Sequence, residues 1–314
     1  MPLIRRRLGE TDLTVSPVGL GCDFMGTRLD DALSFAILDR YADRGGNFLD
    51  TAAVYGRWVE GAENASERTL GRWLRRRPHS GEIVVATKGG HYDLSAPAVS
   101  RVDRREIARD IEDSLAALGL DAIDLYWLHR DDPARPIEEI LSWMEDFVRE
   151  GKIRFYAASN FTAARLRQAY AAAARHGWQG FSAVSDMYSP ASLTDAGRAA
   201  MDPTLVVTGE AELAFHRETG TPLIPYASTA HGWFARMASG ADVSPSLAKS
   251  YDTPHNRAML RRLTEEAKRE GFDVQTAVLA ECMRQPFQVI PLTSVSRAEQ
   301  LDALAPLLCG GYVP

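Results

Sequence analysis

The sequence has few cysteines, and this shortage excludes several kinds of structural and catalytic site. Its three cysteines (Cys22, Cys282 and Cys309) are widely spaced and form no Cys-x-x-Cys pair, which argues against a disulfide framework or a structural zinc site. No His-Glu-x-x-His or Gly-x-Ser-x-Gly motif occurs, no metal site is expected, and thiol catalysis by Cys22 lacks an evident base. The cysteine pattern fits a reducing cytosol, so we expect a cytoplasmic protein.

Long apolar runs and an excess of positive charge are also absent. No stretch approaches the ~18 apolar residues that a membrane span needs, and no apolar segment follows the N-terminal arginines as in a signal peptide. The net charge of -6 and the pI near 5.7 argue against a nucleic-acid surface, which needs a basic excess. We therefore expect neither a nucleic acid nor a membrane as partner.

Lysine is rare as well. Only four lysines (Lys88, Lys152, Lys249 and Lys268) stand among 36 basic residues. Arginine stays protonated, whereas a buried lysine is a compact charge that can take part in proton chemistry. Each lysine is therefore a candidate for a role that arginine cannot fill.

Eight short apolar runs recur along the chain and alternate with helical patterns. The runs are VGLGC from residue 18, NFLDTA from 47, IVVATK from 83, AIDLYWLH from 122, IRFYAAS from 153, FSAVSDM from 181, PLIPYAS from 222 and QVIPLTS from 288. One helix is predicted over 103–120, opened by Asp103 and closed by Gly119. Eight buried strands alternating with helices predict a closed parallel (β/α)8 barrel, the TIM barrel.

Two segments lie outside this alternation. The start, RRRLGETDLTVSPVG, alternates around a turn and predicts a β-hairpin that closes the bottom of the barrel. Residues 229–254 predict a long loop after the seventh strand. No linker rich in Gly, Ser or Pro divides the series, so we expect residues 1–314 to form a single domain.

Polar side chains fall where successive strands end. Asp50 ends the second strand, Lys88 the third and His129 the fourth, while Ser159 and Asn160 follow the fifth. Strand periodicity places each ionisable group above inward-facing apolar residues. The C-terminal ends of barrel strands form active sites, so these groups are expected at one rim.

Tyr55, in the loop after the second strand, suggests what this rim does. Asp50 and Lys88 can pair, which places the ammonium near the Tyr55 phenol. A free tyrosine has a pKa of about 10, and a neighbouring ammonium is expected to draw that pKa toward neutrality. With a second hydrogen bond from His129, the set suits proton delivery to a carbonyl oxygen, or removal from an alcohol.

Each residue alone has a plainer interpretation. Asp50 and Lys88 could form a structural ion pair, His129 could be a hydrogen-bonded core histidine, and Tyr55 a loop aromatic. The conjunction of all four at one rim favours a site. The remaining histidines, His91 among them, are expected at the surface or in loops.

With these residues in place, the chain resembles the aldo-keto reductases over nearly its whole length. The resemblance runs through RRLGETDLTVSPVGLG, NFLDTAAVYG, ASERTLG, VVATKGG, DLYWLHRDDP, EGKIRFYAASN, PLIPYAS and QPFQVIPLTSVSRAEQL. It implies a catalytic tetrad of Asp50, Tyr55, Lys88 and His129. It also implies that NADPH binds in extended form and that hydride passes to a carbonyl carbon while Tyr55 protonates its oxygen.

The resemblance further implies a cofactor site. Ser159 and Asn160 match residues that hold the nicotinamide amide, Tyr226 the aromatic that stacks on its ring, and 228–232 the loop over the pyrophosphate. Ser294 to Arg297 match the segment that grips the adenosine phosphate. The full set of expected cofactor-binding residues is Cys22, Asp50, Ser159, Asn160, Ser185, Tyr226, Ser228, Ser294, Ser296, Arg297 and Gln300.

Three departures bear on this site. Ser185 stands where the family usually has a glutamine, and the segment SVSR lacks the usual basic residue at its first position. Ala303 and Leu304 replace the acid and asparagine that typically read adenine. Arg297 is then the expected phosphate partner and favours NADP, with NAD as an alternative and weaker cofactor binding as the consequence.

Substrate choice is assigned to the loops. Aromatic walls are expected from Trp58, Tyr92, Tyr188 and Trp233, and polar groups from Arg57, His91, Asp186 and His231. This mixture suits a hydroxylated carbonyl compound, including a sugar. Two other functions stay open: a non-redox barrel enzyme that uses Tyr55 and Lys88 for elimination or isomerisation, and a non-catalytic nucleotide-binding subunit.

Overall fold

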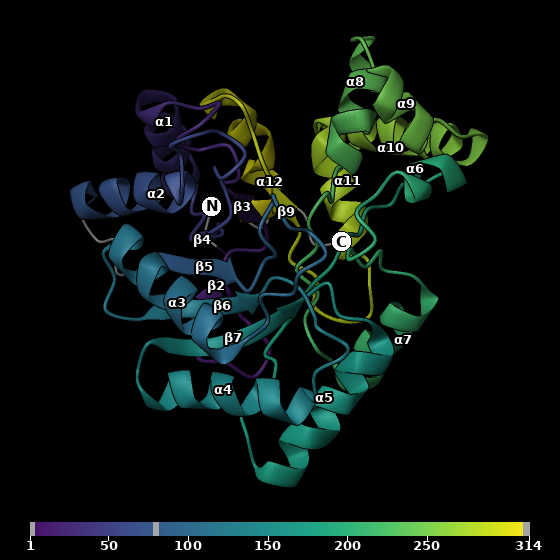
Figure 1. The fold of residues 1–314 in the computed structure, drawn as a ribbon. Coiled ribbons are helices and arrows are strands. Elements are labelled where there is room, and N and C mark those ends of the chain that lie inside the picture. Colours follow the sequence, from purple (N-terminus) through teal and green to yellow (C-terminus); the bar gives the residue numbers. More distant parts are fainter. Residues whose placement is uncertain (1–3, 78–81, 310–314) are drawn as a thin grey trace.

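A computed structural model describes residues 4–77 and 82–309 (Figure 1). Its centre is a curled parallel sheet of seven strands in the order β8-β7-β6-β5-β4-β3-β9. These strands are β3 (Gly19–Gly21), β4 (Phe48–Asp50), β5 (Val84–Gly89), β6 (Ile123–Leu128), β7 (Ile153–Ser159), β8 (Val184–Ser185) and β9 (Leu292–Thr293).

The seventh predicted strand closes the sheet into a barrel. Leu223 forms parallel bridges to Val184 on one side and to Val289, just before β9, on the other. Pro222 and Pro225 flank this bridge, and proline has no N–H to give to a ladder. The seventh strand is therefore present only as isolated bridges, at Leu223 and at Tyr226, which pairs with Met187, and the predicted TIM barrel is confirmed.

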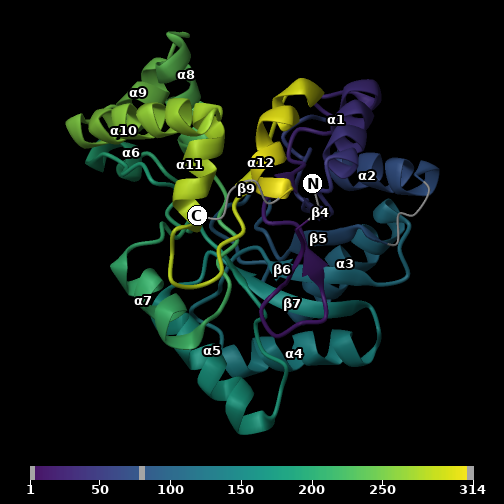
Figure 2. The same cartoon turned by 180° about the vertical axis from the view of Figure 1, so that it is seen from behind.

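The barrel interior is packed with side chains from alternate strand positions. Phe48, Ala86, Leu125 and Trp127 are fully buried there in one cluster. The cluster also takes in the hairpin of β1 (Arg6–Arg7) and β2 (Thr14–Val15) through its buried residues Leu8, Leu13 and Val15. The predicted hairpin is thus confirmed, and Figure 2 shows it from behind. The inward-facing positions below the rim are therefore apolar, and the inward-facing polar groups lie at or just after the C-terminal ends of the strands.

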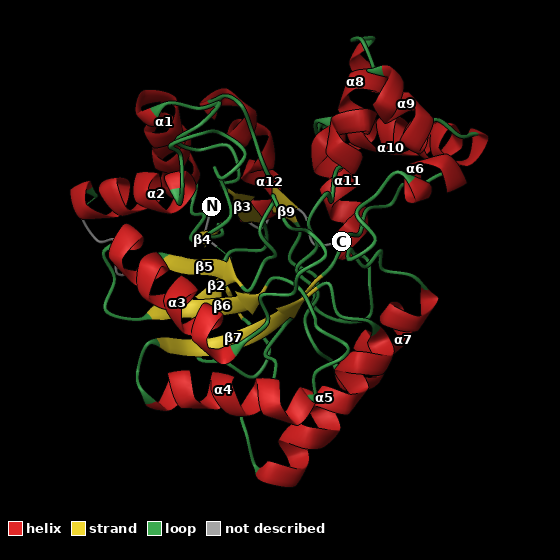
Figure 3. Ribbon diagram, in the orientation of Figure 1, coloured by secondary structure: helices red, strands yellow, loops and turns green. Residues whose placement is uncertain are grey.

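Helices cover the outside of the barrel (Figure 3). They are α1 (Asp31–Asp43), α2 (Ala65–Arg76), α3 (Arg104–Leu118), α4 (Ile137–Arg149), α5 (Ala163–His176), α7 (Glu210–Thr219), η3 (Ala298–Leu304) and α12 (Ala305–Leu308). The short helix α6 (Asp195–Ala199) lies instead against the connection that follows the seventh strand. The predicted caps of α3 are confirmed, because Asp103 accepts a hydrogen bond from the Arg105 N–H at 2.9 Å and Gly119 ends the helix with φ of 70°.

The long connection after the seventh strand is present, and it is largely helical rather than irregular. Residues 229–254 contain η2 (Ala230–Gly232), α8 (Trp233–Ser239) and α9 (Pro245–Tyr251), and α10 (Pro254–Glu270) and α11 (Val274–Met283) follow before β9. Trp233, Phe234, Tyr251 and Leu263 pack together in one buried cluster. Figure 1 shows α8, α9 and α10 beside the barrel. Between 4 and 77 and between 82 and 309, no helix is long and apolar enough to span a membrane.

Candidate active site

Four polar side chains meet at the C-terminal rim of the barrel. Asp50 and Lys88 are 2% and 3% exposed and form an ion pair, so each charge compensates the burial of the other. The Lys88 Nζ also donates hydrogen bonds to the Thr51 carbonyl at 2.8 Å and to the Tyr55 hydroxyl at 3.1 Å. The ring of Tyr55 lies edge-on to that of His129, with 6.1 Å between centroids. The structure therefore brings together the four side chains that the sequence places at this rim.

A tight turn places Tyr55 over the rim. The Tyr55 N–H donates to the Ala52 carbonyl at 3.0 Å, and Gly56 follows with φ of 111°. A Cβ at position 56 would lie 2.2 Å from the Ala62 oxygen, so only glycine fits there. The hydroxyl of Thr51 bonds to that of Ser66 at 2.7 Å, which ties the start of the turn to α2.

The protonation states differ in part from those that the sequence suggests. Burial raises the pKa of Tyr55, and the nearby Lys88 charge lowers it only partly, so the net direction is upward. The expected fall of this pKa toward neutrality is therefore wrong in this arrangement, because burial outweighs the ammonium. Burial opposes the charge on Lys88, but the Asp50 carboxylate and Tyr55 raise the pKa of this lysine overall. The phenol keeps its proton beside a permanent cation.

His129 is held neutral. Burial lowers its pKa well below the usual range, and the charges of Arg130, His91 and Lys88 add to the effect. His91, expected at the surface or in a loop, lies in a loop but is only 7% exposed, and it packs against His129 with 4.8 Å between ring centroids. A neutral imidazole can still donate one hydrogen bond to a substrate oxygen.

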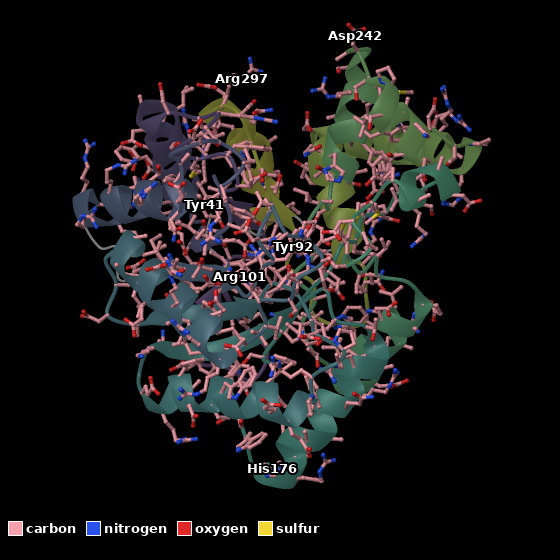
Figure 4. All side chains as sticks on the ribbon, in the orientation of Figure 1. Tyr41, Tyr92, Arg101, His176, Asp242 and Arg297 are labelled. Atoms are coloured by element: carbon pink, nitrogen blue, oxygen red, sulfur yellow. The ribbon has the colours of Figure 1, made fainter. Side chains whose placement is uncertain are left out.

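The four side chains open into a cleft of about 1100 Å³ that runs from Tyr55 to Arg297. Figure 4 shows Arg297 and Asp242 on opposite sides of the upper part of the molecule. Besides the four, the predicted site residues that line the cleft are Ser159, Asn160, Tyr226, Ser228, Ser294, Arg297, Gln300, Trp58 and His231. Predicted residues that do not line it are Cys22, Arg57, His91, Ser185, Asp186, Ser296, Tyr92, Tyr188 and Trp233.

Several of the predicted residues do not line the cleft because their side chains are buried elsewhere or bonded to other groups. Cys22 is 1% exposed, its thiol donates to the Leu20 carbonyl at 3.5 Å, and burial raises its pKa well above the usual value. Trp233 is fully buried in the core of the helical connection. The Tyr188 hydroxyl accepts from Gln285 at 2.9 Å beside a separate small cavity.

The nicotinamide end of the expected site is a connected network of hydrogen bonds. The Asn160 amide donates to the Ser159 hydroxyl at 3.0 Å and accepts from the Tyr226 hydroxyl at 2.7 Å. Ser159 donates to the Ser185 carbonyl at 2.8 Å, while the Ser185 hydroxyl is buried and has no partner among the described residues. Asp186, expected in a substrate loop, is instead fully buried and accepts from the Asn160 N–H at 2.7 Å.

Sequence reasoning missed Arg130 and Asp202. Arg130 lines the cleft directly after His129, and it pairs with Asp202 at 3.4 Å. The adjacency of an arginine to His129 was a visible signal. Asp202, its partner, lies 72 positions further along the chain in a loop. The sequence therefore contains no sign that these two residues pair.

The family of the chain is decided by its sequence as a whole. The sequence model of the Aldo/keto reductase family matches residues 17–308. The chain belongs to this family. Aldo-keto reductases are oxidoreductases of carbonyl compounds, and they typically use a nicotinamide cofactor.

Individual aldo-keto reductases and oxidoreductases align along most of the chain. It is similar to the uncharacterized oxidoreductase YrpG of Bacillus subtilis, at 29% identity over 94% of this chain and 87% of that protein. It is similar to the aldo-keto reductase AFTS1 of Alternaria alternata, at 28% identity over 96% and 87%. It is also similar to the norsolorinic acid reductase stcV of Emericella nidulans, at 27% identity over 93% and 73%.

The cleft suits an aldo-keto reductase cofactor in its charge. Arg28, Arg236 and Arg297 line it, and none of them forms an ion pair with a carboxylate in the part of the chain that the structure describes. Unpaired guanidinium groups match phosphate oxygens in geometry and charge. Ala303 and Leu304 also line the cleft, so its wall there is apolar. Among the described residues no cluster of His, Cys, Asp or Glu could hold a metal ion.

Proposed function

We propose that this protein reduces an aldehyde or ketone to the alcohol, or runs the reverse reaction, with NADP(H) as cofactor and Tyr55 as the acid. One observation carries the proposal: the Tyr55 hydroxyl faces the cleft within hydrogen-bond distance of Lys88, itself paired with Asp50. A proton donor needs both a held proton and a stabilised conjugate base. Burial supplies the first and Lys88 the second.

In this reaction each of the four residues Asp50, Tyr55, Lys88 and His129 has its own role in proton transfer. Tyr55 donates its proton to the carbonyl oxygen, and the Lys88 ammonium stabilises the phenolate left behind. His129, held neutral, donates a hydrogen bond to the same oxygen and fixes its position between the two rings. Asp50 keeps Lys88 charged and in place. A bound nicotinamide would supply the hydride that the carbonyl carbon gains.

Two arginines of the cleft wall are proposed to bind the phosphates of the cofactor, and one of them favours NADP over NAD. Arg297 is exposed at the far end of the cleft, where the extra phosphate of NADP would meet an unpaired guanidinium. Arg236, on α8, also lines the cleft and would meet the pyrophosphate that NADP and NAD share. Ser159, Asn160 and Tyr226 would hold the nicotinamide.

Trp58 and the relatives suggest where to look for substrates. The Trp58 side chain is 46% exposed on the cleft wall, and its ring centroid lies 6.1 Å from that of Tyr55. An exposed indole beside the reacting group can stack on an aromatic or sugar ring. One relative is named a norsolorinic acid reductase, so norsolorinic acid belongs in the screen beside ring-bearing carbonyl compounds that could stack on Trp58.

The test has two stages on the purified chain. A fluorescence titration should give micromolar or tighter binding of NADPH, well ahead of NADH. Addition of 4-nitrobenzaldehyde and a panel of ring-bearing carbonyl compounds should then cause loss of NADPH absorbance. Failure of both nucleotides to bind below millimolar concentrations, or binding with no carbonyl reduced, would refute the proposal in favour of a non-redox barrel enzyme.

A further inference from the structure

Arg130 is fixed in the cleft wall beside the candidate acid–base residues. Its side chain is 10% exposed and lines the same cleft as Tyr55 and Trp58. Its guanidinium donates to the His129 carbonyl at 2.8 Å and to the Thr204 hydroxyl at 2.8 Å. Together with the bond to Asp202 at 3.4 Å, these bonds use three of the five N–H donors that a guanidinium carries. A rigid donor group therefore stands next to the residue that would orient the substrate carbonyl.

Asp202 neutralises this arginine. The two groups pair at 3.4 Å, and Asp202 also accepts from the Tyr92 hydroxyl at 2.6 Å and from Thr204 at 2.7 Å. Burial opposes the charge on Asp202, but the bonds from Tyr92 and Thr204 and the Arg130 charge lower its pKa to about 2. Arg130 thus offers N–H donors with its net charge already compensated.

The loop that carries Asp202 is pinned on both sides. Thr204 is held by Arg130, and the Val206 N–H donates to the Asn160 side chain at 3.2 Å. Leu205, between these anchors, lines the cleft. The space around the reacting carbonyl therefore has apolar walls from Leu205 and Trp58, with Arg130 as the polar group beside His129.

Resting on the proposed carbonyl reduction, we propose that Arg130 determines substrate specificity. It selects carbonyl compounds with an uncharged oxygen, a hydroxyl or second carbonyl, on the carbon next to the reacting carbonyl. An oxygen at that position would face the free guanidinium N–H groups while the carbonyl oxygen meets Tyr55 and His129. A carboxylate there would meet the negative charge of Asp202 as well, so the Arg130–Asp202 pair disfavours it.

Three aldehydes of similar size test this assignment: propanal, glycolaldehyde and glyoxylate. They carry on the neighbouring carbon a methyl group, a hydroxyl group and the oxygens of a carboxylate. The measured quantity is the ratio of kcat/KM between two aldehydes for each enzyme form. Comparing each variant with wild type cancels the hydration of each aldehyde in water and any general effect on turnover.

Arg130→Met should lower the preference for glycolaldehyde over propanal by about tenfold or more, because a hydrogen bond to a charged donor is lost. Arg130→Lys should restore only part of it, since one ammonium cannot replace a forked guanidinium. An unchanged ratio in Arg130→Met would overturn the assignment.

Asp202→Asn removes the negative charge that compensates Arg130 and leaves the arginine in place. It should raise the preference for glyoxylate over glycolaldehyde by about tenfold, because the guanidinium charge is no longer compensated. Tyr92→Phe is the matched control: it removes one bond to Asp202 but leaves both charges, so this ratio should stay at the wild-type value. Equal shifts in the two variants would mean that loop anchoring sets the preference, against the proposal.

The proposed function and the role of Arg130 fail separately. If wild type reduces no carbonyl compound, including 4-nitrobenzaldehyde, the proposed function falls. If wild type reduces 4-nitrobenzaldehyde while neither ratio moves in Arg130→Met or Asp202→Asn, only the role of Arg130 is wrong.

Discussion

The Nζ of Lys88 lies 3.1 Å from the Tyr55 hydroxyl and is ion-paired with Asp50 on the other side. The ammonium therefore joins a buried carboxylate from the end of β4 to a phenol from the following loop. This arrangement keeps a cation next to a tyrosine whose pKa burial has raised. The cation would stabilise the phenolate that forms when the tyrosine gives up its proton.

A first prediction concerns the energetics of the buried pair. Lys88→Met should lower the free energy of unfolding by about 3–5 kcal/mol, because it leaves Asp50 buried and uncompensated. The double variant with Asp50→Asn should recover part of that loss. Lys152→Met, which removes a lysine from exposed pairs with Glu112 and Glu150, is the control and should cost less than about 1 kcal/mol. Urea denaturation measures these three and the single variant Asp50→Asn, and a double variant whose loss equals the sum of the two single losses would contradict the pairing argument.

A second prediction concerns the cofactor arginines. Arg297→Gln should weaken NADPH binding by about tenfold and leave NADH binding nearly unchanged, since only NADPH carries the extra phosphate. Arg236→Gln should weaken both nucleotides by similar factors. Arg269→Gln, at an exposed site on α10 paired with Glu270, is the control. Equal losses for both nucleotides in Arg297→Gln would remove that residue from the phosphate site.

A third prediction separates two buried serines. The Ser159 hydroxyl donates to the Ser185 carbonyl and accepts from the Asn160 amide, so Ser159→Ala should cost about 1–3 kcal/mol. The Ser185 hydroxyl has no partner in the described structure, so Ser185→Ala should be neutral or slightly stabilising. Chemical denaturation distinguishes them. A large loss in Ser185→Ala would show that this hydroxyl has a partner after all.

A fourth prediction uses a buried acid behind the site. Glu67 is fully buried on α2, and burial raises its pKa from 4.5 to about 7 although Ser114, Thr87 and Asn64 oppose the rise. The folded state therefore binds the proton more tightly than the unfolded state does. This group's contribution to stability is present below pH 4.5 and is lost as pH rises to about 7, by about 3 kcal/mol.

Glu67→Gln should remove that pH dependence. Urea denaturation at both ends of this pH window gives the comparison: the free energy of unfolding should fall less with rising pH in the variant than in wild type. Parallel pH profiles for the two proteins would exclude a proton held at Glu67.

Strand ends could be predicted from sequence, and long-range packing could not. Strand periodicity indicates which side of β4, β5 and β6 faces the barrel interior, so the sequence alone places Asp50, Lys88 and His129 at one rim. The position of Trp233 could not be predicted in this way. In a connection whose fold is unknown, the sequence does not distinguish an aromatic residue that lines a cleft from one that is buried in a core. The burial of Trp233 depends on how α8, α10 and α11 pack together.

The sequence predicted the direction in which the Lys88 charge shifts the pKa of Tyr55, but not the net shift of that pKa. The sequence indicated that Lys88 would lower the pKa of Tyr55, and it does, but the larger effect is burial, which depends on the complete fold. Arg130 and Asp202 illustrate the same limit, because one lies next to His129 and the other in a distant loop. Only the closed barrel brings the two together.

The most direct test of the central claim is the steady-state kcat of Tyr55→Phe for aldehyde reduction, measured beside its Kd for NADPH. Loss of the proton donor should lower kcat by at least about a hundredfold. The phenyl ring should keep the packing at the rim, so NADPH binding should stay near wild type. A variant that kept about a tenth or more of wild-type kcat would show that another group delivers the proton, and the assignment of Tyr55 would be wrong.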